Sequence, residues 1–156
     1  MTLISKNSLA LLIGINYVRS SYELHGCVND INNIKNLLIL QYGYTENNII
    51  MLHDDIDDDS LKPTYDNIIN NINKIVTNVV SNTNIVFYYS GHGCLSDEKS
   101  FNCEDELCSC DNKYLLADVL KKTLIDPLPS DCKGSTIGLN IKLQYIPPIF
   151  RIGVKP

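Results

Sequence analysis

Residues 9–89 alternate between short apolar runs and longer segments in which apolar residues recur every three or four positions. The apolar runs cover residues 9–16, 48–52 and 84–89, and such runs are typical of strands buried on both faces. The periodic segments, residues 29–43 and 63–81, are typical of amphipathic helices. This alternation predicts right-handed crossovers and an α/β fold with a mostly parallel sheet between helices.

The second half of the chain has weaker patterns. A polar, cysteine-rich stretch runs to Asp111 and predicts a loop, and residues 114–124 predict a third helix that prolines 127 and 129 stop. From residue 135 to 143 apolar and polar residues alternate, which is typical of a half-exposed strand. With no internal repeat and no clear linker, the 156 residues are expected to form one domain.

Charge and composition exclude several classes of protein. The net charge of −5 argues against a nucleic-acid surface, which needs clustered Lys and Arg. No apolar run approaches the roughly 20 residues of a membrane span, and the run at residues 9–15 is not followed by a small-residue cleavage site. We therefore expect a cytoplasmic protein that does not bind membranes, with its six cysteines reduced.

A candidate catalytic histidine follows the third predicted strand, in Ser90-Gly91-His92-Gly93. The end of a strand is where α/β sheets bind ligands, and an imidazole can act as a general base near neutral pH. The flanking glycines are expected to let the backbone turn sharply. The alternative is a turn histidine that ends the strand and has no catalytic role.

Five segments, in order, resemble the type I metacaspases, which are caspase-like cysteine peptidases. They are ALLIGINY at 10–17, LHGCVND at 24–30, YGY at 42–44, YSGHG at 89–93 and DPLP at 126–129. The resemblance covers residues 9–133. It implies a caspase-like three-layer α/β sandwich, incomplete at the C-terminus, with a caspase-like domain at 1–133 and a divergent tail at 134–156.

The resemblance also implies site residues and a protein substrate cleaved after Arg or Lys. His92 would be the histidine of a Cys-His dyad, and Gly93 would offer its backbone N–H to the oxyanion. Asp30 and Ser90 would line the pocket for the basic side chain, because a carboxylate suits a guanidinium. For Asp30 the alternative is a charge at a helix N-terminus, and one side chain can do both.

The resemblance breaks at the nucleophile. A gapless continuation places Ile141 at the nucleophile position and Leu139 at a pocket aspartate, and no cysteine follows Cys132. We therefore expect a truncated or frame-shifted pseudoenzyme that binds basic peptides or another metacaspase chain. The other function class is an active cysteine endopeptidase with His92 as the base. Cys27 is the candidate substitute nucleophile for it, since a helix N-terminus lowers thiol pKa; the alternative for Cys27 is a small buried thiol.

Two metal sites are conceivable. The resemblance implies calcium bound by Asp105 and Asp118, but Ala117 replaces one carboxylate and the site is incomplete. The acidic run 54–59 lacks the Gly and distal Glu of an EF-hand and is expected to be a solvated loop. Zinc could bind four thiols and stabilise an interaction module; the alternative is a loop of reduced thiols. These four are Cys94, Cys103, Cys108 and Cys110.

Overall fold

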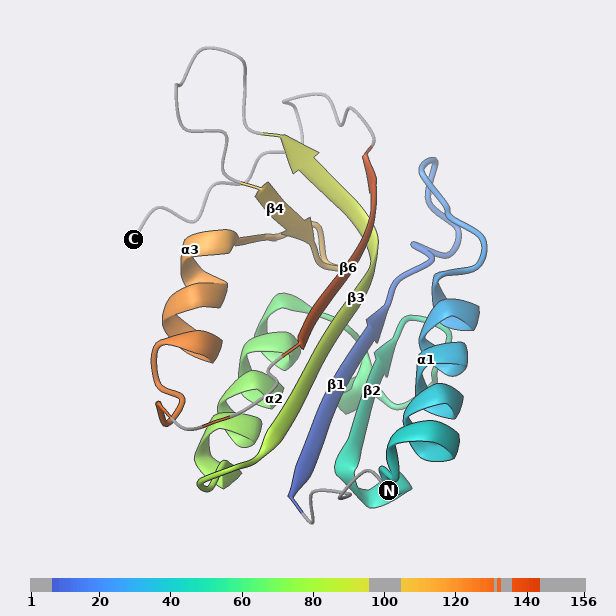
Figure 1. Cartoon of the computed structure of the whole chain (residues 1–156). Coiled ribbons are helices and arrows are strands. Elements are labelled where there is room, and N and C mark those ends of the chain that lie inside the picture. The colour runs from blue at the N-terminus through green and yellow to red at the C-terminus, as the bar shows by residue number, and fades with distance from the viewer. Residues whose placement is uncertain (1–6, 96–104, 131, 133–135, 144–156) are drawn as a thin grey trace.

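The computed structural model describes residues 7–95, 105–130, 132 and 136–143 (Figure 1). The strands are β1 (Ser8–Gly14), β2 (Ile49–His53), β3 (Asn84–Leu95), β4 (Asp105–Cys108), β5 (Tyr114–Leu116) and β6 (Thr136–Leu143). The helices are α1 (Cys27–Tyr42), α2 (Tyr65–Asn78) and α3 (Ala117–Leu120), which a π-helical turn continues over Lys121–Ile125. Short 3-10 turns lie at Glu46–Asn48 and Asp59–Leu61. None of the helices in these ranges is long and apolar enough to cross a lipid bilayer.

The six strands form one sheet in which β3 is the central member. β1 runs parallel to β2 and to β3, and β6 runs parallel to β3. The short strands β4 and β5 are antiparallel, β4 to the end of β3 and β5 to β4. Because β6 occupies one edge of β3 as far as Gly93, β1 and then β4 must follow each other along the opposite edge. The predicted mostly parallel sheet is confirmed.

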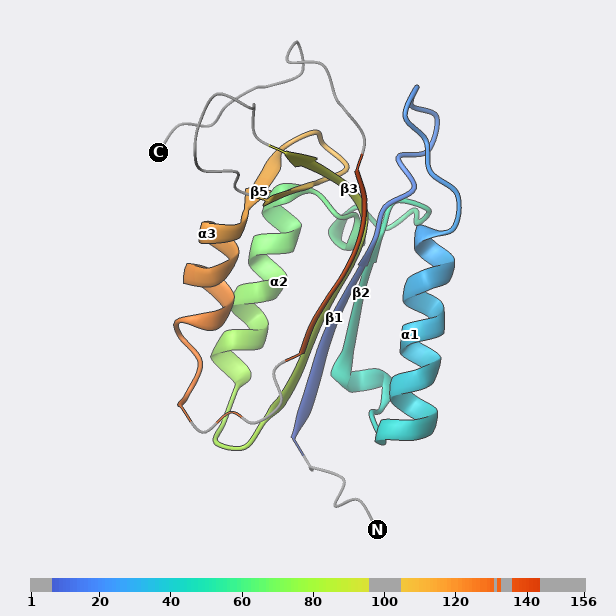
Figure 2. The ribbon, with the colours of Figure 1, turned by 45° about the horizontal axis from the view of Figure 1, so that its top comes forward.

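Helices cover both faces of the sheet (Figure 2). α1 lies on one face, and α2 and α3 lie on the other. The larger core lies on the α2 side and contains Leu11, Phe87 and Ile72, whereas the smaller core lies on the α1 side and contains Leu12 and Ile31. Successive side chains of a strand point to opposite faces, so β1 and β3 each contribute side chains to both cores. This is the predicted three-layer α/β arrangement.

The first two predicted helices form close to the expected positions. α2 begins after Thr64, whose hydroxyl accepts a hydrogen bond from the N–H of Asn67, as an N-cap residue does. α1 ends at Tyr42 and is capped by Gly43, which has a φ of 71° that suits glycine. α1 begins two residues earlier than predicted, at Cys27, and α2 ends at Asn78 instead of near Ser81.

Two predictions for the second half are wrong. The stretch predicted as a loop up to Asp111 contains β4, and the helix predicted from Tyr114 begins as strand β5. Both strands have four residues or fewer, which is too short for a hydrophobic period to appear. They form because each pairs with a neighbour, and β4 pairs with an extension of β3 beyond its apolar run.

The alternating segment near the C-terminus forms the predicted strand, β6. It pairs with β3 from Val86 opposite Thr136 to Gly93 opposite Leu143. The assignment of this segment to a tail separate from residues 1–133 stays a prediction. Its position matters for function, because β6 is the strand beside the one that carries His92.

Candidate functional site

His92 lies buried near the carboxyl end of β3, with 0% of its surface exposed. Its ring packs against the rings of Tyr17 and Tyr22, at centroid distances of 4.6 Å and 5.9 Å. The Nε2 atom lies 2.6 Å from the backbone carbonyl oxygen of Tyr22. Because a carbonyl can only accept, Nε2 carries a proton and donates it to this carbonyl oxygen.

The backbone does not turn at His92, contrary to the prediction. β3 continues through both glycines to Leu95, and neither of those glycines has a positive φ. Gly91 is needed for another reason: a Cβ there would lie 2.5 Å from the Tyr89 hydroxyl oxygen and 3.1 Å from that of Tyr17. Gly93, the predicted oxyanion donor, pairs in register with residues of β4 and β6.

Asp30 and Ser90, both predicted to bind a basic side chain, are in contact. The Ser90 hydroxyl donates to Oδ2 of Asp30 at 2.8 Å; Ser90 is fully buried and Asp30 is half-buried in the first turn of α1. Gly14 lies beside Ser90 in the sheet, where a Cβ would come within 2.6 Å of the Cys27 carbonyl oxygen. Since alternate residues of a strand share a face, Ser90 and His92 both face the α1 layer.

Cys27 is the first residue of α1, at the helix N-terminus as predicted. Its thiol-bearing side chain is fully buried, and its N–H donates to Oδ1 of Asn16 at 3.0 Å. A nucleophilic role for Cys27 stays a prediction. A thiol with no exposed surface would meet a peptide bond only after α1 or the loop before it moved.

The register of β6 fixes which residues lie next to the histidine. Ile141 is the partner of Gly91, and Lys142 is the partner of His92. Partners in a parallel ladder lie side by side on the same face, as the core residues of β1 and β3 illustrate. The position beside His92 is therefore one residue later than the gapless alignment expects, and neither residue carries a thiol.

The predicted metal ligands are only partly described. Asp118 lies in the first turn of α3 and is exposed, and Asp105 begins β4, one position before the pair Glu106–Leu116. The side chains of Asp105 and Cys94, and the whole of Cys103, lie outside the described residues; Cys108 is buried and Cys110 half-buried. Within the described ranges, no group of three His, Cys, Asp or Glu residues could hold a metal ion. The described residues therefore do not by themselves fit calcium or zinc, and both metals stay predictions.

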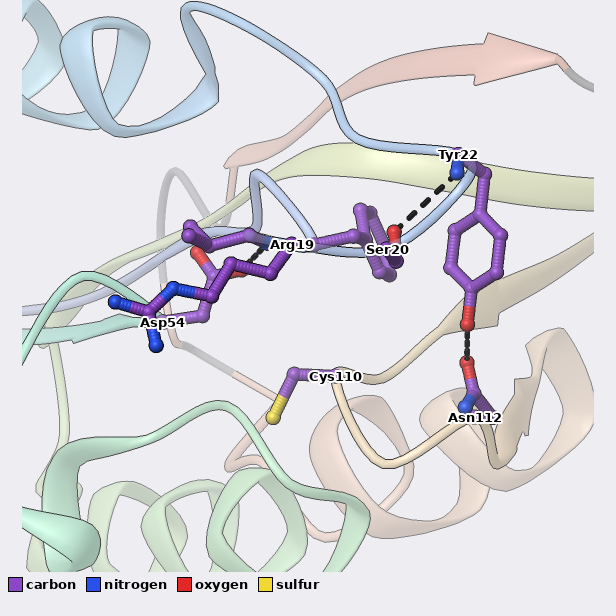
Figure 3. A pocket seen from close by; sticks show the side chains of 8 residues that line it. Arg19, Ser20, Tyr22, Asp54, Cys110 and Asn112 are labelled. Atoms are coloured by element: carbon purple, nitrogen blue, oxygen red, sulfur yellow. Dashed lines mark hydrogen bonds between the residues drawn. The ribbon is translucent and has the colours of Figure 1, made fainter.

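A polar pocket of ≈ 260 Å³ is lined in part by Tyr17 and Tyr22, the two tyrosines whose rings pack on His92 (Figure 3). The sequence did not predict it, because it forms where three loops meet and three of its residues have a positive φ: Tyr17, Arg19 and Asn112. Its lining residues are Tyr17, Val18, Arg19, Ser20, Tyr22, Asp54, Cys110 and Asn112.

Hydrogen bonds hold the walls of this pocket together. Asp54 was predicted to lie in a solvated loop, but its carboxylate accepts from the backbone N–H groups of Asn16 and Val18, at 2.8 Å and 3.2 Å. The Tyr22 hydroxyl donates to Oδ1 of Asn112 at 2.6 Å. Burial, with the nearby carboxylates of Asp111 and Asp54, raises the pKa of the Cys110 thiol to about 11, so this thiol is neutral at physiological pH.

Comparison with known proteins identifies a family. The family description "Metacaspase, peptidase C14 domain" matches residues 8–137. Among curated proteins, Metacaspase-1 of Pyricularia oryzae is 43% identical over 88% of this chain and 38% of its own length. Metacaspase-1 of Debaryomyces hansenii is 35% identical over 88% of this chain and 34% of its own, and Metacaspase-6 of Arabidopsis thaliana is 39% identical over 83% and 36%.

A solved structure shares the fold. Protein GSU0716 from Geobacter sulfurreducens has a TM-score of 0.63 and 19% sequence identity, over 85% of this chain and 48% of that one. At this identity the likeness concerns the fold alone. The chain spans roughly a third of the length of the curated relatives named above.

Proposed function

This chain belongs to the metacaspase family of peptidases, and we propose that it binds a basic side chain of a peptide or protein without cleaving it. One observation carries the proposal. The strand beside His92 is β6, and its residues at the two positions next to the histidine are Ile141 and Lys142. A Cys-His dyad needs a thiol at this point.

Binding of a basic side chain is supported by the contact between Asp30 and Ser90. The hydrogen bond from Ser90 holds the Asp30 carboxylate in one orientation, and a half-buried carboxylate forms strong charge-assisted hydrogen bonds with a guanidinium or ammonium group. The net charge of −5 favours the approach of a cationic peptide. The chemistry of the site therefore selects Arg or Lys.

The lack of cleavage is supported by the state of His92. The ring is fully buried, and its Nε2–H is bonded to the carbonyl oxygen of Tyr22. Without a neighbouring thiol, the imidazole has no nucleophile to deprotonate. Loss of a nucleophile lowers kcat by several orders of magnitude, about 10⁶-fold in a serine peptidase.

Calorimetry with an arginine-containing dipeptide amide tests the binding. We expect weak affinity that falls as salt is added, and a loss of about tenfold or more in Asp30→Asn, because the charge-assisted hydrogen bonds are removed. The matched control is Asp126→Asn, which removes an exposed carboxylate paired with Lys121. Equal affinities for wild type and Asp30→Asn would rule out Asp30 as the group that binds the basic side chain.

Peptidase assays test the absence of cleavage. We expect no turnover of Arg or Lys amide substrates by the purified chain, with or without calcium. Turnover that disappears in Cys27→Ala would make Cys27 the nucleophile. Turnover that survives in Cys27→Ala but is lost in His92→Ala would show that another group attacks the substrate, and it would overturn the proposal.

Restoring a thiol provides a sharper test of the strand register. Lys142→Cys places a thiol at the partner position of His92, whereas Ile141→Cys, the matched control, places it on the opposite face. We expect only Lys142→Cys to react rapidly with iodoacetamide, because a nearby imidazole raises the thiolate fraction. Rapid reaction of Ile141→Cys alone would mean that the gapless alignment, and not this register, describes the site.

A further inference from the structure

β3 has a gap in its strand pairing at the histidine. Along the edge of β3 that pairs with β1 and then with β4, the pairing with β1 ends at Gly14–Ser90. The pairing with β4 starts at Gly93–Leu107. Within the described part of the chain, Gly91 and His92 have no strand partner on this edge. Buried backbone groups without a hydrogen bond are costly, so the polar groups in the gap need other partners.

Two phenol hydroxyls fill the gap. The N–H and the carbonyl of one residue in a strand point to the same edge, and both of these groups of His92 are bonded to tyrosines. The N–H donates to the hydroxyl oxygen of Tyr17 at 3.0 Å, and the carbonyl oxygen accepts from the hydroxyl of Tyr89 at 2.7 Å. The two hydroxyl oxygens lie 3.0 Å apart.

The same hydroxyls connect the histidine to the hairpin formed by β4 and β5. Both lie within hydrogen-bond distance of the Cys108 carbonyl oxygen, Tyr17 at 2.6 Å and Tyr89 at 2.8 Å. Tyr17 and Tyr89 are 4% and 0% exposed, and burial is the largest cause that raises the pKa of each phenol above its usual value. Burial therefore favours the protonated phenols, which can donate hydrogen bonds.

We propose that Tyr17 and Tyr89 are positioning residues for His92, which replace the missing strand with two side-chain hydroxyls. By fixing the N–H and the carbonyl of His92, they hold the imidazole where Nε2 meets the carbonyl oxygen of Tyr22. The ring of Tyr17 packs against the imidazole as well. This role does not depend on whether the chain cleaves or only binds peptides.

NMR of the full chain tests the proposal without any activity. In Tyr17→Phe the ring stays and only the hydroxyl is lost, so we expect the His92 amide to exchange with solvent about tenfold faster, relative to amides that open only on global unfolding. We also expect the long-range ¹⁵N spectrum to show a smaller fraction of the Nε2–H tautomer of His92. The control is Tyr44→Phe, a buried tyrosine in the smaller core on the α1 side.

If Tyr17 had a purely structural role, Tyr17→Phe would lower global stability but leave the His92 tautomer and the relative exchange rate of the His92 amide as in wild type. That result would overturn the proposal. A second variant covers the case in which Tyr17→Phe does not fold. Incorporation of 3,5-difluorotyrosine at position 17 keeps the ring and the hydroxyl but weakens the oxygen as an acceptor. We expect the His92 amide proton to move upfield, and an unchanged shift would contradict the contact.

Discussion

Gly91 determines how closely the two phenols approach the backbone of His92. A Cβ at this position would lie 2.5 Å from the Tyr89 hydroxyl oxygen, so Gly91→Ala is expected to lower the free energy of unfolding by about 1–3 kcal/mol, as overpacking of a core does. Urea denaturation measures the change. In the background of Tyr89→Phe, which removes the nearest atom, the same substitution should cost less; an equal cost in both backgrounds would contradict this packing.

Asp111 links the turn between β4 and β5 to α2. Its Oδ1 accepts from the N–H of Tyr65 and from the hydroxyl of Ser109, and its Oδ2 pairs with Lys113. Burial acts to raise the pKa of Asp111, but these hydrogen bonds outweigh it and the net pKa lies below the usual value. The stability that Asp111 contributes is therefore present above the unfolded pKa of about 3.9 and is lost as the pH falls through the folded pKa.

We expect Asp111→Asn to be less stable than wild type by no more than about 1 kcal/mol near neutral pH, because the group is partly exposed. The difference should shrink as the pH falls through the acid range, and urea denaturation at a series of pH values measures it. Asp126→Asn serves as the control for a surface ion pair. A difference that stays constant down to the lowest pH would show that the ionised carboxylate is not the stabilising form.

The site residues that the sequence predicted are those carried by local motifs. The sequence predicted Asp30 and Ser90 to bind a basic side chain and His92 to be the histidine of the dyad, and the fold brings Asp30 and Ser90 into contact. The partners that hold His92 were not predicted. The hydroxyls of Tyr17 and Tyr89 converge from positions 72 residues apart, and no local pattern indicates that a phenol replaces a strand.

The elements with a clear hydrophobic period were predicted well, because burial on one or both faces determines them. β1, β2, α1 and α2 lie within a few residues of the expected positions. The β4–β5 hairpin was missed for a physical reason: its strands are stabilised by pairing with β3 and with each other, and not by an apolar face of their own. Tertiary pairing can override weak local propensity.

β6 protects an edge of the central strand, which leads to a prediction for a shortened chain. A chain that ends at residue 133 lacks β6 and exposes the edge of β3 from Val86 to Gly93. Exposed edges of apolar strands pair with other molecules, so we expect a lower Tm and larger species in size-exclusion chromatography. The control is a chain that ends at Leu143, which keeps β6. Monomers of unchanged Tm for the shorter chain would show that β6 is not part of the folded unit.

Metal ions are expected to leave the stability of the whole molecule unchanged. Within the described residues no group of three His, Cys, Asp or Glu side chains could hold a metal ion. After treatment with a chelator, we expect the same Tm in millimolar calcium and in stoichiometric zinc. A ligand that binds the native state must raise the Tm, so an upward shift with either ion would reveal a site that includes residues outside the described ranges.

The close approach at Gly14 has a consequence for specificity. Gly14 touches no ligand in the proposed site, yet it lies beside Ser90 and faces the carbonyl of Cys27, at the start of the helix that carries Asp30. Any side chain at position 14 would push that helix outward and lengthen the 2.8 Å contact between Asp30 and Ser90. We therefore expect the spacing of the proposed Asp30–Ser90 site to depend on the absence of one methyl group in the sheet beside it, at a position that a bound peptide would not touch.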